Sequence, residues 1–123
     1  MHQLAVFGNP ITHTRSPEIH QLFAKQHGLE IDYEPILVPP GEFARYAHRF
    51  LEGGAKGFNI TVPYKADAYH FVEQCSKAAV LAEAVNTISI KQGVIYGDNT
   101  DGAGLMKDIV DNLGWTLQDK KVL

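Results

Sequence analysis

Short apolar runs alternate along the chain with longer segments in which apolar residues recur every three or four positions. The apolar runs that end in glycine or proline predict three buried strands, at 4–8, 33–38 and 57–62. The segments with helical spacing predict helices at 17–27, 43–52, 64–72 and 77–83. This alternating order is typical of a parallel sheet with helices on both faces.

The second half of the chain adds a hairpin and a final helix. Apolar runs at 86–90 and 94–96 flank the turn Lys91-Gln92-Gly93 and predict two antiparallel strands. A helix is predicted over 100–113, and Gly114 ends it. The predicted fold class is therefore α/β, a three-layer α/β/α architecture with a mainly parallel twisted sheet and one antiparallel hairpin.

The last four residues, Lys120-Lys121-Val122-Leu123, resemble the beginning of a further strand. A domain rarely ends two residues into an apolar run. We therefore expect residues 1–118 to form one domain and residues 119–123 to begin a second domain. We also expect this chain to be a truncated form that lacks the rest of the second domain.

Composition and charge are those of a soluble globular domain. Hydrophobic residues make up 45% of the chain and charged residues 20%, with a formal net charge of −3. No block of lysine and arginine favours nucleic acid or an anionic membrane as a partner, and no apolar run approaches the roughly 20 residues of a membrane span. The single cysteine, Cys75, excludes an internal disulfide and favours a cytoplasmic location.

Ligands of open parallel sheets bind beyond the carboxyl ends of the strands, so polar residues there are the candidates for chemistry. The loop 9–17 follows the first strand and carries Thr14 and Ser16 at the start of a helix. A helix N-terminus offers free N–H groups and partial positive charge, which suit a carboxylate or phosphate. Alternatively, Ser16 only caps the helix, with Pro17 as its first residue, and Thr14 satisfies loop backbone groups.

The segment 59–65 departs from the usual pattern of a helix start. Pro63 is expected at the first helical position, which makes Val62 a poor N-cap and puts Lys65 into the first turn. The helix dipole disfavours a cation there by roughly 0.3–1 kcal/mol, and departures of this kind often mark functional sites. We interpret Lys65 as a candidate for acid–base chemistry, with a solvated surface lysine as the alternative.

Two further segments carry polar groups. Asn86 begins the hairpin and can offer a donor and an acceptor to a polyol, although a turn-forming asparagine fits the pattern as well. Asn99 or Thr100 can cap the last helix. Asp101 either complements the dipole of that helix or faces Lys65 as a hydrogen-bonded charge pair.

Cofactor and metal motifs are incomplete. Gly102-Ala103-Gly104 lacks the third glycine of a dinucleotide fingerprint. Six histidines are present, but none forms the i, i+4 pair of a metal site on a helix. We expect ordinary surface histidines and an inert Cys75.

Taken together, four segments resemble the N-terminal substrate-binding domain of the shikimate dehydrogenase family in order and spacing. They are Gly8-Asn9-Pro10-Ile11 with His13-Thr14-Arg15-Ser16-Pro17, Asn59-Ile60-Thr61-Val62-Pro63-Tyr64-Lys65, Ala84-Val85-Asn86-Thr87, and Gly97-Asp98-Asn99-Thr100-Asp101-Gly102. The resemblance covers essentially the whole chain. It implies an NADP-dependent enzyme that reduces 3-dehydroshikimate to shikimate in aromatic amino-acid biosynthesis.

The resemblance also implies a role for each site residue. Thr14 and Ser16 match two hydroxyls on the substrate carboxylate, and the family commonly has serine at the first of these positions. Lys65 matches the catalytic lysine, paired with Asp101. The positions that match groups on the ring hydroxyls are Asn59, Thr61, Asn86 and Asp101.

The chain departs from the family by lacking the Gly-rich loop that binds NADP. The resemblance implies that a separate domain binds the cofactor, so we expect this chain alone to be inactive. It also implies a bared apolar surface that promotes self-association. Two alternatives stay open: a quinate/shikimate dehydrogenase that can use NAD, and a non-catalytic module that binds a polyol acid.

Overall fold

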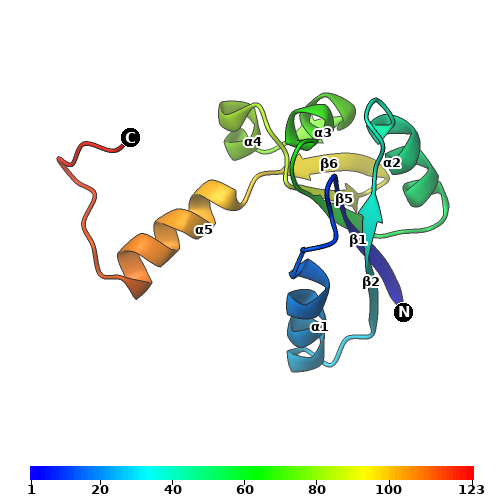
Figure 1. Cartoon of the computed structure of the whole chain (residues 1–123), viewed down its shortest axis with the longest axis horizontal. Coiled ribbons are helices and arrows are strands. Elements are labelled where there is room, and N and C mark those ends of the chain that lie inside the picture. The colour runs from blue at the N-terminus through cyan, green and yellow to red at the C-terminus, as the bar shows by residue number, and fades with distance from the viewer.

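The computed structural model describes residues 1–123, and a six-stranded sheet is its centre (Figure 1). The strands are β1 (His2–Gly8), β2 (Ile31–Leu37), β3 (Gly57–Ile60), β4 (Gln74–Cys75), β5 (Thr87–Lys91) and β6 (Val94–Asp98). Their order is β2-β1-β3-β5-β6-β4. β1 pairs in parallel with β2 and β3, and β4 with β6, whereas β5 is antiparallel to both of its neighbours.

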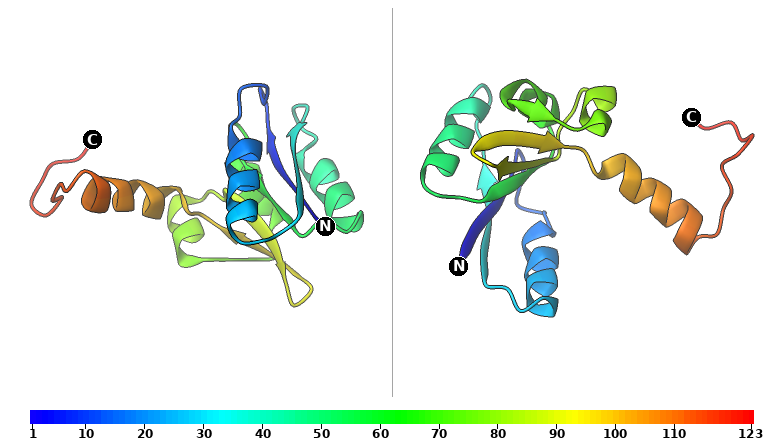
Figure 2. Two further views of the ribbon diagram at one scale, coloured as in Figure 1. Left: turned by 90° about the horizontal axis from the view of Figure 1, so that it is seen from below. Right: turned by 180° about the vertical axis from the view of Figure 1, so that it is seen from behind.

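Helices lie on both sides of this sheet, as the sequence predicted (Figure 2). They are α1 (Ser16–Gln26), α2 (Phe43–Glu52), α3 (Lys65–Phe71), α4 (Lys77–Ala82) and α5 (Asp101–Lys107), which continues as a π-helical turn, Asp108–Asn112. α1 packs on one face, and α2 and α3 pack on the other (Figure 2). α5 runs outward from the end of β6, away from the sheet (Figure 1).

Alternation along β1 supplies a hydrophobic core on each face of the sheet. Ala5 and Phe7 point to the side of α2 and α3, where 12 buried residues form the larger core. Phe7 is fully buried there and stacks on Phe58, with ring centroids 4.3 Å apart. Val6 points to the side of α1 and packs in a smaller cluster with Tyr33. The predicted α/β fold with a mainly parallel sheet and one hairpin is confirmed.

Two predicted helix starts are wrong. Ser16 is the first residue of α1 rather than its N-cap, because Thr14 Oγ1 accepts the Ser16 N–H at 3.2 Å and Arg15 takes the cap position. Pro63 is not the first residue of α3. A hydrogen bond of 3.1 Å from Tyr64 N to the Thr61 carbonyl closes a turn before the helix, so that the helix begins at Lys65.

Residues 120–123, which the sequence predicts to begin a strand of a second domain, form no strand within this chain, and the domain boundary stays a prediction. These residues form no regular structure, and Val122 is 73% exposed. A strand needs a neighbour to satisfy its backbone groups, and this segment lies apart from the sheet (Figure 1). The short strand β4 has no counterpart in the prediction, since two residues are too few to show a periodic pattern. None of the helices has the length and apolar character needed to cross a membrane.

Candidate functional site

The polar segments singled out in the sequence meet at one edge of the sheet. β1 and β3 end at this edge, and antiparallel pairing brings the start of β5 and the end of β6 to the same place. In register, Asn59 faces Thr87, and Thr87 faces Asp98. The first residues of α3 and α5 follow directly. The topology thus collects side chains from segments far apart in the sequence.

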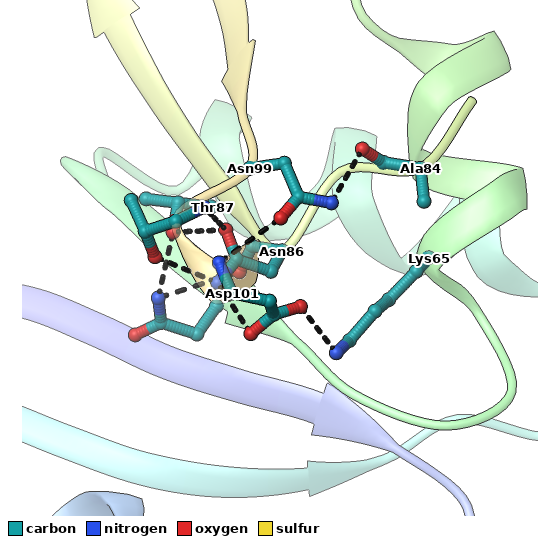
Figure 3. Close-up of polar contacts among 8 residues, drawn as sticks. Lys65, Ala84, Asn86, Thr87, Asn99 and Asp101 are labelled. Carbon is teal, nitrogen blue, oxygen red and sulfur yellow. Dashed lines mark hydrogen bonds and ion pairs between the residues drawn. The ribbon is translucent and has the colours of Figure 1, made fainter. Parts of the chain in front are cut away.

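Lys65 and Asp101 form an ion pair at the centre of this edge (Figure 3). Lys65 Nζ donates to Asp101 Oδ2 at 2.6 Å, and the two side chains are 34% and 51% exposed. Each is the first residue of its helix, α3 and α5. The α5 dipole favours Asp101, whereas the α3 dipole disfavours Lys65. The carboxylate therefore offsets an unfavourable position and leaves the ammonium partly accessible to a ligand.

Asn86 links this ion pair to the sheet (Figure 3). Its Nδ2 donates to Thr100 Oγ1 at 2.8 Å and to Asp101 Oδ1 at 3.1 Å. Its Oδ1 accepts from the Thr100 N–H and the Thr87 hydroxyl, both at 3.0 Å. Both donors and both acceptor positions of the amide are in use. The Asn86 side chain therefore has one fixed orientation and holds the start of α5.

Asn59 lies on β3, next to β5, and extends the hydrogen-bonded network of Asn86. Its Nδ2 donates to Thr87 Oγ1 at 3.2 Å and, more weakly, to the Asn86 carbonyl at 3.4 Å. Its Oδ1 accepts from the Tyr33 hydroxyl at 2.8 Å. Four of the predicted residues, Asn59, Lys65, Asn86 and Asp101, thus belong to one hydrogen-bonded network.

Thr14 and Thr61 lie outside that network, and Ser16 adjoins it through the Tyr33 hydroxyl. Thr14 Oγ1 accepts the Ser16 N–H within the loop, which is the alternative role that the sequence predicts for this residue. The Ser16 hydroxyl does not cap α1. Thr61 donates its backbone N–H to the Phe7 carbonyl, and its methyl group lies against Gly8, where an added Cβ would come within 2.5 Å. The close approach of Thr61 explains why residue 8 is a glycine.

Four residues of the site did not stand out in the sequence as functional candidates. The Asn99 side chain accepts the Asp101 N–H at 3.0 Å and donates to the Ala84 carbonyl at 3.1 Å. These two hydrogen bonds join the start of α5 to the loop before β5. The other three are Tyr33, Thr87 and Thr100. Thr87 is the last residue of the motif Ala84-Val85-Asn86-Thr87, and Asn99 and Thr100 were predicted only as helix caps. Tyr33 lies in a strand, and the pattern of that strand gives no indication of a functional role.

Burial shifts the titration of the Tyr33 hydroxyl to higher pH. Burial raises the pKa of the Tyr33 hydroxyl to about 12, and the Ser16 side chain close by opposes part of this rise. The hydroxyl, which is neutral at physiological pH as in any tyrosine, thus remains a donor at alkaline pH as well. The folded chain retains this proton between pH 10 and 12, where the unfolded chain loses it, so that stability falls as pH rises through this window.

We expect Tyr33→Phe to reduce the alkaline loss of stability by roughly 2–3 kcal/mol. The measurement is the free energy of unfolding as a function of pH for both proteins. Tyr69→Phe is the matched control, because the Tyr69 hydroxyl is outside the network. An unchanged pH dependence in Tyr33→Phe would contradict the assignment of the shift to this residue.

Gly102 and Gly104, which resemble part of a dinucleotide motif in the sequence, are helical residues in the structure. Gly102 and Gly104 lie inside α5 rather than in a strand-to-helix loop, and nothing lies within 4 Å of a Cβ added at either position. No backbone approach requires these glycines, and the third position of a dinucleotide fingerprint is Lys107. No group of three or more His, Cys, Asp or Glu side chains is placed to hold a metal ion.

Known proteins resemble this chain over most or all of its length. The family model for the shikimate dehydrogenase substrate binding domain matches residues 6–88. A shikimate dehydrogenase (NADP+) from Ruthia magnifica subsp. Calyptogena magnifica is 51% identical over the whole chain, which spans 46% of that relative. One from Chromobacterium violaceum is 45% identical over 97% of the chain, which spans 44% of its length.

Solved structures show the same fold. An Ael1 enzyme from Pseudomonas putida has a TM-score of 0.92 at 39% identity, over 97% of this chain and 44% of its own. Shikimate 5-dehydrogenase from Thermus thermophilus, in complex with shikimate, has a TM-score of 0.88 at 29% identity, over 98% of this chain and 46% of its own. The family model covers the end of β1, all of β3 and the start of α3, whereas Asp101 lies beyond it. The chain therefore belongs to the shikimate dehydrogenase substrate-binding domain family.

Proposed function

We propose that this chain is the substrate-binding domain of an NADP-dependent shikimate dehydrogenase, which reduces 3-dehydroshikimate to shikimate. The observation that carries the proposal is the Lys65–Asp101 ion pair, which lies among amide and hydroxyl groups at one edge of the sheet. The chain spans less than half of the relatives that carry this name. The activity is therefore proposed for the longer protein, and substrate binding for this part.

Lys65 is the group that we assign to proton transfer. Reduction of a ketone to an alcohol places negative charge on the carbonyl oxygen, which then takes up a proton. The Lys65 ammonium can stabilise that charge and donate the proton, which is typically worth about 10²–10⁴-fold in rate. Asp101 holds Lys65 Nζ at 2.6 Å and thereby limits the directions in which it can point.

Recognition of the substrate needs an anion site and several polar groups. The N-terminus of α1 supplies N–H groups and partial positive charge, and we propose that Thr14 and Ser16 add hydroxyl donors for the carboxylate. We propose that Asn59, Thr61 and Asn86 bind the ring hydroxyls of the substrate. Asn86 would exchange one of its hydrogen bonds within the chain for one to the substrate, so that a polyol without the matching hydroxyl leaves a group without its partner, which gives the site its specificity.

NADPH supplies the hydride in this reduction, and we propose that it binds to the part of the longer protein outside this chain. We therefore expect the chain by itself to show no NADPH-dependent turnover. Steady turnover of 3-dehydroshikimate by the pure chain would contradict this prediction.

A chimaera tests the proposed function. This chain replaces the matching segment of the Ruthia magnifica relative, so that the remainder of that relative completes the protein. We expect shikimate-dependent reduction of NADP+, measured by the absorbance of NADPH, with quinate as the competing substrate. Equal kcat/KM for quinate would favour the quinate/shikimate alternative. Binding of shikimate without any turnover would favour a non-catalytic module and overturn the proposal.

We also propose that the isolated chain self-associates through apolar side chains on α5 and the segment after it. Leu105, Leu113 and Trp115 are 62%, 52% and 61% exposed and lie on the part of the chain that runs away from the sheet. Light scattering should show a mass that rises with concentration, and Leu113→Lys should reduce the rise. A constant monomer mass at millimolar concentration would contradict this prediction.

A further inference from the structure

The hydrogen bonds between Tyr33 and Lys65 form one continuous path along the edge of the sheet. The Tyr33 hydroxyl donates to Asn59 Oδ1, and Asn59 Nδ2 donates to Thr87 Oγ1. The Thr87 hydroxyl donates to Asn86 Oδ1, and Asn86 Nδ2 donates to Asp101 Oδ1. The second oxygen of Asp101 accepts from Lys65. We refer to these six residues as the relay.

The direction of the donors matters because several members can be oriented in two ways. A side-chain amide exchanges its donor and acceptor ends when it flips, and a hydroxyl rotates to suit its neighbours. Asn59 and Thr87 border a cavity of about 230 Å³, so Asn59 has space on one side in which to turn. The Asn86 carbonyl favours the same orientation of Asn59 only weakly, through a hydrogen bond of 3.4 Å, so a donor at the beginning of the relay is the stronger influence on this amide.

Tyr33 meets the requirements for that fixed donor. It is only 6% exposed, and its ring stacks on His20 with centroids 4.5 Å apart and an angle of 12° between the planes. His20 is itself held, since its Nδ1 lies 2.9 Å from the Ser16 carbonyl oxygen. A phenol has one O–H and no alternative donor, and this one points to Asn59 Oδ1 at 2.8 Å. His20 is therefore a packing partner of the site rather than an ordinary surface histidine.

We propose that Tyr33 and Thr87 are positioning residues. Tyr33 sets the amide orientation of Asn59, and Thr87 transmits it to Asn86 by tightening an orientation that the Thr100 N–H also favours, so that together they set the donors and acceptors presented to the substrate ring. The proposal rests on the proposed function for its substrate, whereas the relay itself is a property of the chain. Neither residue needs to touch the substrate. Without the Tyr33 hydroxyl, Asn59 Oδ1 loses its partner, the amide can flip, and the Thr87 hydroxyl can turn away from Asn86.

The first part of the test is an NMR measurement and does not depend on enzyme activity. In Tyr33→Phe the ring and its stacking on His20 remain, and only the first donor is lost. We expect the side-chain amide resonances of both Asn59 and Asn86 to shift in NMR spectra of the chain, although Asn86 does not contact Tyr33. The Asn99 amide, which donates to the Ala84 carbonyl outside the relay, is the internal control. A shift confined to Asn59 would overturn the relay.

The second arm measures kinetics in the chimaera. We expect Tyr33→Phe to raise KM for shikimate about fivefold, the value of one net hydrogen bond, with kcat within about twofold. Loss of folded protein alone would lower apparent kcat at constant KM. Thr87→Val should have a similar effect, and the double variant should be no worse than either single one, because both break the same relay. Tyr69→Phe is the matched control.

The outcomes separate the two proposals. An inactive unmodified chimaera would contradict the proposed function, while the NMR arm would still decide on the relay. An active chimaera with unchanged KM in Tyr33→Phe, or with additive effects in the double variant, would overturn the positioning role.

Discussion

Lys65→Ala is expected to lower kcat/KM for shikimate in the chimaera by about 10²–10⁴-fold. The reason is that Lys65 is the cation that the structure places at the centre of the site, 2.6 Å from Asp101 and partly accessible. Its removal leaves the developing negative charge on the substrate oxygen without a nearby donor. The effect should appear mainly in kcat, because the residues that bind the substrate carboxylate and ring hydroxyls in the ground state remain.

Two controls make this prediction specific. Lys77 is likewise the first residue of a helix, α4, but it has no ion pair, so Lys77→Ala should leave the rate unchanged. The stability of Lys65→Ala should fall by less than about 1 kcal/mol, since the pair is partly exposed to solvent. A similar loss of rate in both variants, or less than tenfold loss in Lys65→Ala, would remove Lys65 from the mechanism.

Phe7→Ala is expected to lower the free energy of unfolding by roughly 3–5 kcal/mol, the usual cost of deleting a buried aromatic ring. Phe7 is fully buried in the central strand. Its ring lies within 4.3 Å of Phe58 and 5.5 Å of Phe50, measured between centroids. A domain of this size has a total stability of about 5–15 kcal/mol, so that this single change removes a large part of it.

The measurement is denaturant unfolding followed by circular dichroism, with Phe23→Ala as the matched control. Phe23 is 53% exposed on α1, and its truncation should cost about 1 kcal/mol or less. Equal losses in the two variants would show that the aromatic cluster under the sheet is not the main source of stability.

Local patterns were sufficient for most of the secondary structure. The three apolar runs became β1, β2 and β3, and the turn around Gly93, with φ at 79°, joins β5 to β6 as predicted. These elements depend on contacts between residues close in sequence, which a pattern can show. The position of Lys65 at the start of a helix was predicted for the same reason, even though the assumed role of Pro63 was wrong.

Only the tertiary structure decided which polar residues meet. Asp101 lies 36 residues from Lys65, and Tyr33 lies 26 residues from Asn59. Their contacts follow from the strand order and from the antiparallel pairing of β3 with β5, which no local pattern specifies. The sequence by itself determined the elements, the family resemblance and the candidate residues. The tertiary structure decided the relay from Tyr33, because its hydrogen bonds join side chains from different strands and helices.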